Sequence, residues 1–131
     1  MKIWIGCDHA GYDLKKEVIA YLEQHAIAYE DLGCDGSRVD YPDIAKAVCT
    51  AVVANQDAKG ILICGTGIGM SIAANKIKGI RAALCGDCFS AEATRLHNDA
   101  NILALGARVT GPGLAVKIID TFLNTPFSQD E

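Results

Sequence analysis

Residues 60–69, GILICGTGIG, join an uninterrupted apolar run to a turn in which every second residue is glycine. A short apolar run of this kind is typical of a strand buried on both faces, as in a parallel sheet. Glycine tolerates backbone conformations that other residues avoid, so the turn can bend sharply before a helix starts. The segment therefore predicts a buried strand, a tight turn and a helix in direct succession.

The same alternation runs along the whole chain. Apolar and β-branched runs predict strands at residues 2–7, 28–32, 60–64, 80–85 and 102–105. Apolar residues at helical spacing predict helices at residues 12–25, 42–54, 70–76, 90–96 and 112–123. Strands that alternate with helices pair in parallel through right-handed crossovers. We expect one domain over residues 1–131, a Rossmann-like three-layer α/β/α sandwich with a five-stranded parallel sheet, whose ligand lies at the carboxyl ends of the strands.

Charge and hydropathy exclude two classes of partner. The formal net charge is −4, so the chain lacks the basic surface that a nucleic-acid-binding protein needs. No apolar run approaches the ~20 residues of a membrane span, and the first residues do not form the apolar core of a signal peptide. We therefore expect a cytoplasmic protein that binds neither nucleic acid nor membrane.

Six cysteines occur in the chain, and we expect free thiols in a reducing compartment. Cys85 and Cys88 form a C-x-x-C pair, but a thioredoxin-type pair would follow the first strand rather than the fourth. No second pair and no His pair stands nearby to complete a zinc site. We therefore expect neither a redox motif nor a metal here.

Cys64 is the residue of the glycine-rich segment that can carry chemistry. It closes the predicted strand, and the turn after it consists of Gly65, Thr66, Gly67, Ile68 and Gly69. Backbone N–H groups of such a turn can point into one small volume, and the start of the helix adds partial positive charge. This arrangement would stabilise an enediolate and a thiolate. Alternatively, the glycines serve only strand–helix packing and Cys64 is an inert buried thiol.

A dinucleotide-binding turn is a second alternative for the same glycines. The pattern G-x-G-x-x-G would require glycine at Met70 and would follow the first strand of the fold. Asp87, after the next predicted strand, stands where a ribose-binding acid could fall. The two departures argue against this alternative.

Two further polar segments stand next to predicted strands. Asp8 and His9 follow the first strand and could bind sugar hydroxyls, although a cap on the next helix is the simpler role for Asp8. His97 and Asn98 open the turn HNDAN before the fifth strand, where such residues commonly only form the turn. Imidazole nevertheless suits proton transfer near neutral pH, and an amide can bind a hydroxyl or carbonyl group.

Five motifs occur in a fixed order over the length of the chain. They are GCDHAG at 6–11, DYPD at 40–43, ICGTGIG at 63–69, NKIKGIRA at 75–82 and HNDAN at 97–101. In this combination the chain resembles the type B ribose-5-phosphate isomerases of the ribose/galactose isomerase family. The resemblance implies an aldose–ketose isomerase that interconverts ribose 5-phosphate and ribulose 5-phosphate, a reaction of the pentose phosphate pathway, without a metal or organic cofactor.

The resemblance also implies roles for individual residues. Cys64 matches the base that moves a proton between C1 and C2, and His97 matches the group that opens the furanose ring. The implied substrate-binding residues are Asp8, His9, Gly65, Thr66, Gly67, Ile68, Gly69, Asn98 and Arg108. Among them, the backbone of the glycine turn would hold the enediolate, and Arg108 would hold the phosphate. This assignment agrees with the chemistry, which requires a base, a site for an oxyanion and a separate group for ring opening.

Members of the family form homodimers and often homotetramers in which two subunits share each active site. The resemblance therefore implies that His97 serves the Cys64 of a partner chain. It also implies two further phosphate-binding arginines in a C-terminal tail, whereas this sequence has no arginine after Arg108. Either the tail is absent from this sequence or the protein holds phosphate differently, and we favour the first explanation.

Two other functions remain open on the residues alone. Relatives within the family isomerise allose 6-phosphate or galactose 6-phosphate, and the depth of the pocket for a six-carbon sugar cannot be read from the sequence. The intact HNDAN segment and Cys64 favour the ribose enzyme over a galactose-type subunit. A module that binds a phosphosugar without catalysis is the alternative from another class, and the joint presence of Cys64 and His97 favours an enzyme.

Overall fold

The computed structural model describes residues 1–128. Five strands form the sheet: β1 (Lys2–Cys7), β2 (Ala28–Asp31), β3 (Ala58–Cys64), β4 (Ala82–Leu84) and β5 (Ile102–Gly106). The α-helices are α1 (Tyr12–Gln24), α2 (Tyr41–Ala54), α3 (Ile68–Asn75), α4 (Cys88–Ala93) and α5 (Pro112–Asn124). A short 3₁₀ turn, η1 (His9–Gly11), precedes α1, and a π-helical turn, η2 (Thr94–Asn98), follows α4.

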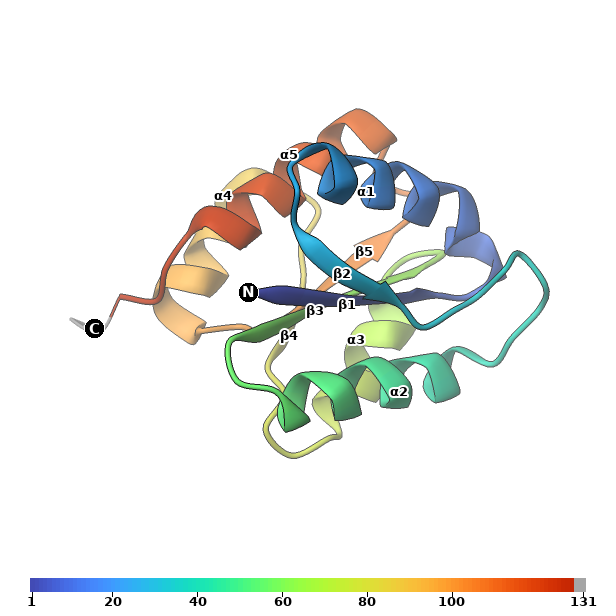
Figure 1. Cartoon of the computed structure of the whole chain (residues 1–131), viewed down its shortest axis with the longest axis horizontal. Helices are drawn as coiled ribbons and strands as arrows, with labels where there is room; N and C mark the ends of the chain where they lie inside the picture. The colour runs from blue at the N-terminus through green and yellow to red at the C-terminus, as the bar shows by residue number, and fades with distance from the viewer. Residues whose placement is uncertain (129–131) are drawn as a thin grey trace.

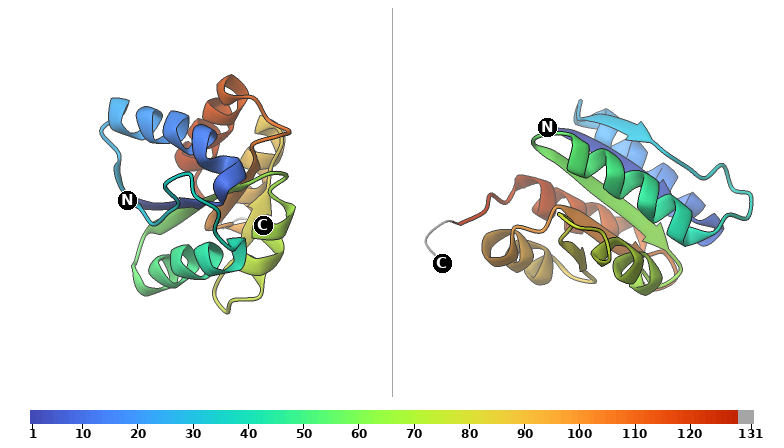
Figure 2. Two further views of the ribbon diagram at one scale, coloured as in Figure 1. Left: turned by 90° about the vertical axis from the view of Figure 1, so that its right-hand side faces the viewer. Right: turned by 90° about the horizontal axis from the view of Figure 1, so that it is seen from below.

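The sheet has the order β2-β1-β3-β5-β4, and all its pairs are parallel. Helices α1, α4 and α5 pack on one face, and α2 and α3 pack on the other (Figures 1 and 2). The expectation of a three-layer α/β/α sandwich with a five-stranded parallel sheet is confirmed. Parallel pairing gathers the carboxyl ends of the strands at one edge of the sheet and their amino ends at the other.

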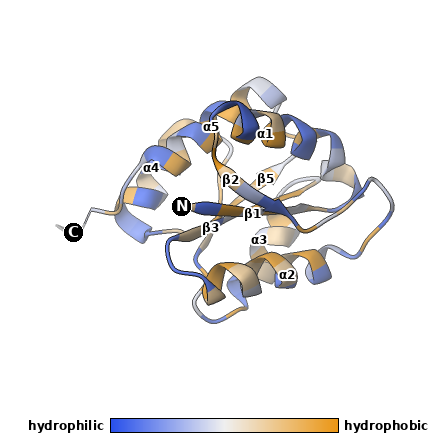
Figure 3. Ribbon diagram, viewed as in Figure 1, coloured by the Kyte–Doolittle hydropathy of each residue, from blue (hydrophilic) through white to orange (hydrophobic). Residues whose placement is uncertain are grey.

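Alternate residues of the central strands enter two separate cores. Ile61 and Ile63 of β3 face the core under α1 and α5, whereas Leu62 and Cys64 face the core under α2 and α3. Helix α1 buries Leu14, Val18 and Leu22 and exposes charged residues, and Figure 3 shows hydrophilic colour along it, whereas α2 is largely hydrophobic. A strand buried on both faces has no polar positions, and this explains the uninterrupted apolar run before the glycine turn.

The fourth β-α unit differs most from the expected boundaries. The strand predicted at residues 80–85 is reduced to β4, which lies at the edge of the sheet and pairs only with β5. The helix predicted at 90–96 begins earlier, because Asp87 caps it by accepting the N–H of Ser90. Its second half is the π-helical turn η2, which ends at Asp99 in the left-handed region. Local apolar pattern does not distinguish a π turn from an α-helix.

All six cysteines are free thiols. The sulfur atoms of Cys7 and Cys34 lie 3.6 Å apart in the interior, a contact between residues that are 27 positions apart in sequence. Within residues 1–128, no helix is both long enough and apolar enough to cross a membrane.

Candidate active site

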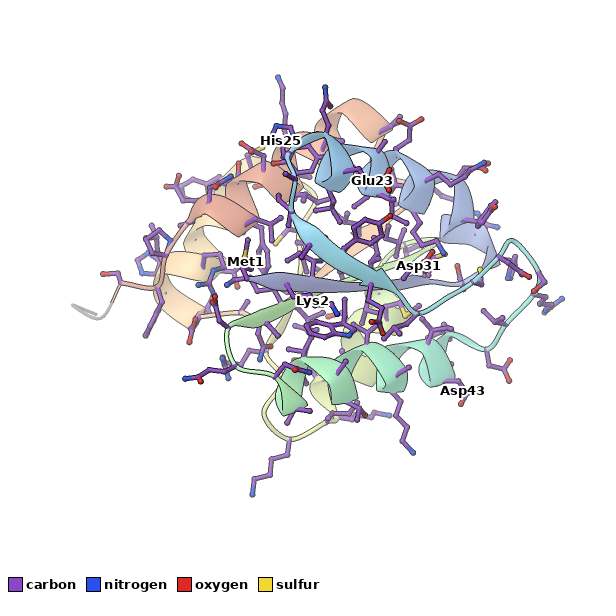
Figure 4. All side chains as sticks on the ribbon, viewed as in Figure 1. Met1, Lys2, Glu23, His25, Asp31 and Asp43 are labelled. Carbon is purple, nitrogen blue, oxygen red and sulfur yellow. The ribbon has the colours of Figure 1, made fainter. Side chains whose placement is uncertain are left out.

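The two edges of the sheet carry different predicted site residues. In Figure 4, Met1 and Lys2 mark the amino edge, where β1 begins, and Asp43 marks the first turn of α2 near the carboxyl edge. The glycine turn, Asp8, His9 and Arg108 lie at the carboxyl edge, which is where ligands of open parallel sheets bind.

Cys64 is the last residue of β3, and its side chain is buried, with 6% of its surface exposed. Its Sγ accepts a hydrogen bond from the backbone N–H of Gly67 at 3.1 Å. The thiol is therefore held in place by the turn that follows it, as a base next to an oxyanion site would need to be.

Gly67 has a conformation and a position that only glycine fits. Its φ is +83°, in the left-handed region. A Cβ atom on Gly67 would lie 2.9 Å from the backbone carbon of Leu105 and 2.5 Å from a side-chain methyl of Leu84. The turn is thus packed closely against β5 and β4 at the residue whose N–H binds the sulfur.

Helix α3 begins at Ile68, within the glycine turn and two residues before the predicted start at residue 70. The N–H of Ile68 donates to Oγ1 of Thr66 at 3.2 Å, so one donor at the helix start is satisfied locally. The other N–H groups of a first helical turn lack partners within the helix, and the helix dipole adds positive charge there. The predicted oxyanion site therefore coincides with the start of α3.

Tyr41 belongs to this edge but was not predicted as a site residue. It opens α2, and a Cβ atom on Gly69 would lie 2.9 Å from its ring. The aromatic ring thus covers one side of the glycine turn. Its place in the DYPD motif was the available signal, but nothing in that motif indicates which turn the tyrosine contacts.

Arg108 lies over the opposite side of the turn. Its backbone N–H donates to the carbonyl of Gly65 at 2.9 Å. Its side chain runs across Gly65, because a Cβ atom there would lie 3.6 Å from the Arg108 guanidinium. Within residues 1–128 this exposed guanidinium makes no hydrogen bond or ion pair, so its donors face solvent beside Cys64.

Asp8 and His9 stand beside the same turn. The backbone N–H of Asp8 donates to the carbonyl of Ile63, the residue before Cys64. One carboxylate oxygen of Asp8 caps η1 by accepting from Ala10 and Gly11, at 3.0 and 3.2 Å, so the capping role is present. His9 is exposed. The pair therefore lies at the carboxyl edge, next to the residue that precedes Cys64.

His97 and Asn98 lie at the other edge of the sheet. They end η2, and the segment after them reaches the amino end of β3, where the N–H of Gly60 donates to the carbonyl of Asn101. Gly60 and Cys64 are four positions apart in β3, and a rise of about 3.3 Å per residue separates them by roughly 13 Å. The chain on its own does not bring His97 to Cys64.

Cys85 and Asp87, which the sequence also offered for consideration, follow β4, and Cys85 lines a hollow together with Thr66 and Ile68 of the glycine turn. Asp87 caps α4 through Ser90, and these bonds lower the pKa of its carboxyl group. Cys85 is buried, and burial followed by the charge of Asp87 raises its pKa to about 11. Among residues 1–128, no group of three or more His, Cys, Asp or Glu side chains is placed to hold a metal ion.

Comparison with known proteins places the chain among sugar-phosphate isomerases. It is 52% identical to ribose-5-P isomerase B of Listeria innocua over 98% of this chain and 87% of the relative. It is 48% identical to ribose-5-phosphate isomerase B of Escherichia coli K12, over 96% of this chain and 85% of the relative. A solved ribose 5-phosphate isomerase from Thermotoga maritima is similar with a TM-score of 0.96 and 50% identity, covering 99% of this chain and 90% of that one. The Ribose/Galactose Isomerase family model matches residues 3–131, and the chain therefore belongs to the ribose/galactose isomerase family.

Proposed function

We propose that this protein interconverts ribose 5-phosphate and ribulose 5-phosphate. The observation that carries the proposal is the placement of Cys64 at the end of β3, with its sulfur accepting the Gly67 N–H at the start of α3. Two relatives at about half identity bear the name of this activity. The six free thiols support a reducing compartment such as the cytoplasm.

The chemistry follows from this arrangement. The Cys64 thiolate removes the proton at C2 of the open-chain aldose and returns it to C1, while the hydroxyl proton moves from O2 to O1. The enediolate formed between these steps carries negative charge on oxygen, which the N–H groups and dipole at the start of α3 stabilise. Arg108, with its donors directed to solvent beside Gly65, is suited to hold the phosphate. No step requires an external electron donor or acceptor, because the isomerisation is internal to the sugar.

Ring opening requires a proton donor and acceptor near the ring oxygen, and His97 is the proposed group. Because His97 lies at the amino edge of its own sheet, we propose that it serves Cys64 of a second copy of the chain. Two copies related by a twofold axis would then form two equivalent sites.

An apolar surface beside the glycine turn supports such a dimer. Ile68, Leu84 and Val109 line a hollow of about 300 Å³ that also touches Thr66 and Gly106. Val109 is 71% exposed, and β4 leaves its outer edge unpaired within residues 1–128. Exposed apolar side chains at a sheet edge are a surface that association would cover.

The direct test is conversion of ribose 5-phosphate by the purified protein without added metal, with allose 6-phosphate as a second substrate. We expect ribose 5-phosphate to be turned over preferentially and the Cys64→Ala variant to be inactive. Binding of ribose 5-phosphate without turnover by the intact protein would contradict the proposal and favour a binding module.

Subunit complementation tests the shared site. Cys64→Ala and His97→Ala proteins are each expected to be defective as homodimers. After subunit exchange, a mixed dimer contains one site with both an intact Cys64 and an intact His97, so activity should return. No recovery in a mixture shown to contain mixed dimers would contradict the shared site.

A further inference from the structure

The turn between η2 and β5 is bonded more extensively than a plain connection requires. Asp99, which follows His97 and Asn98, has φ +51°. Among the described residues, only two others that are not glycine have positive φ, Ala26 and Asp57. A non-glycine residue in this region costs free energy that the surrounding contacts must offset.

Asp99 is held by two arginines from different segments. Its Oδ1 accepts from Nη1 of Arg95 at 2.9 Å, and its Oδ2 lies 3.5 Å from Nη2 of Arg81. Arg81 also donates through Nε to the backbone carbonyl of Asp99 at 2.8 Å. The carboxylate and the backbone of one residue are thereby both fixed.

Arg95 is an unusually buried cation for a surface turn, with 5% of its surface exposed. Besides Asp99, it donates to the carbonyl of Ala100 at 2.7 Å and to that of Thr125 at 3.0 Å. A buried guanidinium whose donors are used in this way is rigid, and removing its anion would leave a buried unpaired charge. The network therefore ties the turn to η2 and to the segment after α5.

The other side of the turn is tied to the loop before β4. The side-chain oxygen of Asn101 accepts the backbone N–H of Arg81 at 2.8 Å, and its amide donates to the carbonyl of Gly79 at 2.9 Å. The turn after His97 and Asn98 is thus anchored on both sides, whereas these two residues themselves are exposed.

We propose that Asp99, held between Arg81 and Arg95, is a positioning residue that sets where His97 lies in the partner's active site. The inference rests on the proposed role of His97 in ring opening. Asp99 does not touch substrate; it fixes the backbone two residues after the imidazole. A shift of about 1 Å in such a group can lower a rate by about 100-fold. Disruption of Asp99 should therefore impair ring opening and spare proton transfer at carbon.

Two variants of Asp99 separate the effect of its carboxylate from the effect of its backbone conformation. Asp99→Gly keeps the left-handed backbone and removes the carboxylate. Asp99→Asn keeps the backbone preference and one acceptor oxygen and removes the charge. Asp57→Gly is the matched control, because Asp57 also has positive φ, at +57°, and lies at the amino edge, where it pairs with the N-terminus at 3.4 Å.

The first measurement compares two reactions of the same enzyme. Turnover of ribose 5-phosphate requires ring opening, whereas ribulose 5-phosphate is acyclic and exchanges a C1 hydrogen with deuterated solvent through the base alone. We expect Asp99→Gly to lose turnover about 10- to 100-fold while exchange changes less than about twofold, and Asp99→Asn to be intermediate. Asp57→Gly should change neither. An equal fall in both reactions, or no fall in turnover, would overturn the inference.

The second measurement mixes Asp99→Gly protein with each of the other two variants and measures whether turnover recovers. Asp99→Gly should recover activity when mixed with Cys64→Ala, since one site then combines an intact Cys64 with a correctly held His97. It should not recover with His97→Ala, and recovery there would overturn the inference. If Asp99→Gly only destabilised the chain, its mixtures with Cys64→Ala and with His97→Ala would behave alike.

Normal turnover by His97→Ala would reject the proposed role of His97 and the inference with it. A defective His97→Ala protein together with a normal Asp99→Gly protein would reject the inference alone.

Discussion

The backbone N–H of Gly67 donates a hydrogen bond to Sγ of Cys64 across 3.1 Å. The bond joins the last residue of β3 to the residue before α3, so it fixes the position of the thiol relative to the start of α3. Gly67 in turn packs against the backbone of Leu105 in β5, so the donor of this bond is held by the sheet. Two predictions concern the two ends of this bond.

Removal of the thiol should abolish catalysis and keep the fold. Cys64→Ala eliminates the base, and Cys64→Ser replaces it with a hydroxyl that does not ionise near neutral pH. A positioned acid–base group contributes about 10²- to 10⁴-fold to a rate, so turnover should fall at least that far in both variants. Steady-state turnover, calorimetric binding of ribose 5-phosphate and thermal unfolding together provide the check. Retention of turnover within a factor of two by Cys64→Ala would remove Cys64 as the base.

Gly67→Ala should damage stability and activity together. The new Cβ atom would meet the backbone of β5 at 2.9 Å, and φ +83° is strained for alanine. The two effects should destabilise the protein by about 2–4 kcal/mol in urea unfolding. Gly113→Ala is the control, since nothing lies within 4 Å of a Cβ atom there and the residue is in α5; it should be neutral or slightly stabilising. Equal unfolding midpoints for both variants would show that the turn is not packed as described.

The carboxyl-edge half of this site could be predicted from the sequence. Strand–turn–helix order places Cys64 and its glycines at the end of β3, and parallel pairing brings Asp8 and Arg108 to the same edge. The placements of Cys64, its glycines and Asp8 follow from local pattern and topology, whereas Arg108 was indicated only by the resemblance to the family. The strands predicted at residues 2–7 and 102–105 agree with β1 and β5 to within one residue, whereas the order of the strands in the sheet was not predicted.

The rest depends on contacts between distant segments. The pairing of Arg81 and Arg95 with Asp99 and the packing of Tyr41 on Gly69 join residues from different β-α units. The π turn of η2 lies between the Asp87 cap of α4 and the Arg95–Asp99 contact, and apolar spacing carries no sign of either. Residue types indicated that His97 could transfer a proton, but only the fold shows that it lies at the opposite edge from Cys64.

Arg108 should affect substrate affinity more than the chemical step. Its guanidinium makes no bond within residues 1–128, so Arg108→Gln should leave thermal unfolding unchanged. A hydrogen bond to a charged group is worth about 1.5–3 kcal/mol, which corresponds to a rise in KM of about 10- to 100-fold for a phosphorylated substrate. Arg108→Lys keeps the charge but not the planar guanidinium, so its KM should lie between those of the unmodified protein and Arg108→Gln. Lys117→Gln, on the exposed side of α5, is the control. A loss confined to kcat would contradict phosphate binding by Arg108.

Alkaline pH should destabilise the protein through its buried thiols. Burial raises the pKa of Cys7 to about 12 and that of Cys49 to about 11. Unfolded thiols ionise near pH ~8.5, so the unfolded chain releases protons at a pH where the folded chain retains them. Stability is therefore fully present below about pH 8.5 and declines as the pH rises toward the folded values.

Urea unfolding at pH 7.5 and pH 10.5 measures this loss, and Cys49→Ala tests its source. Cys49 lies on the inner face of α2 and is fully buried, so its thiol is shielded from solvent in the folded protein. The variant should start from a lower midpoint at pH 7.5, because a buried side chain has been shortened, but it should lose less stability on going to pH 10.5. Every other titrating group is common to the two proteins, so the difference between their pH dependences isolates one thiol. Identical losses in the two proteins would mean that Cys49 ionises equally well in the folded and unfolded chain.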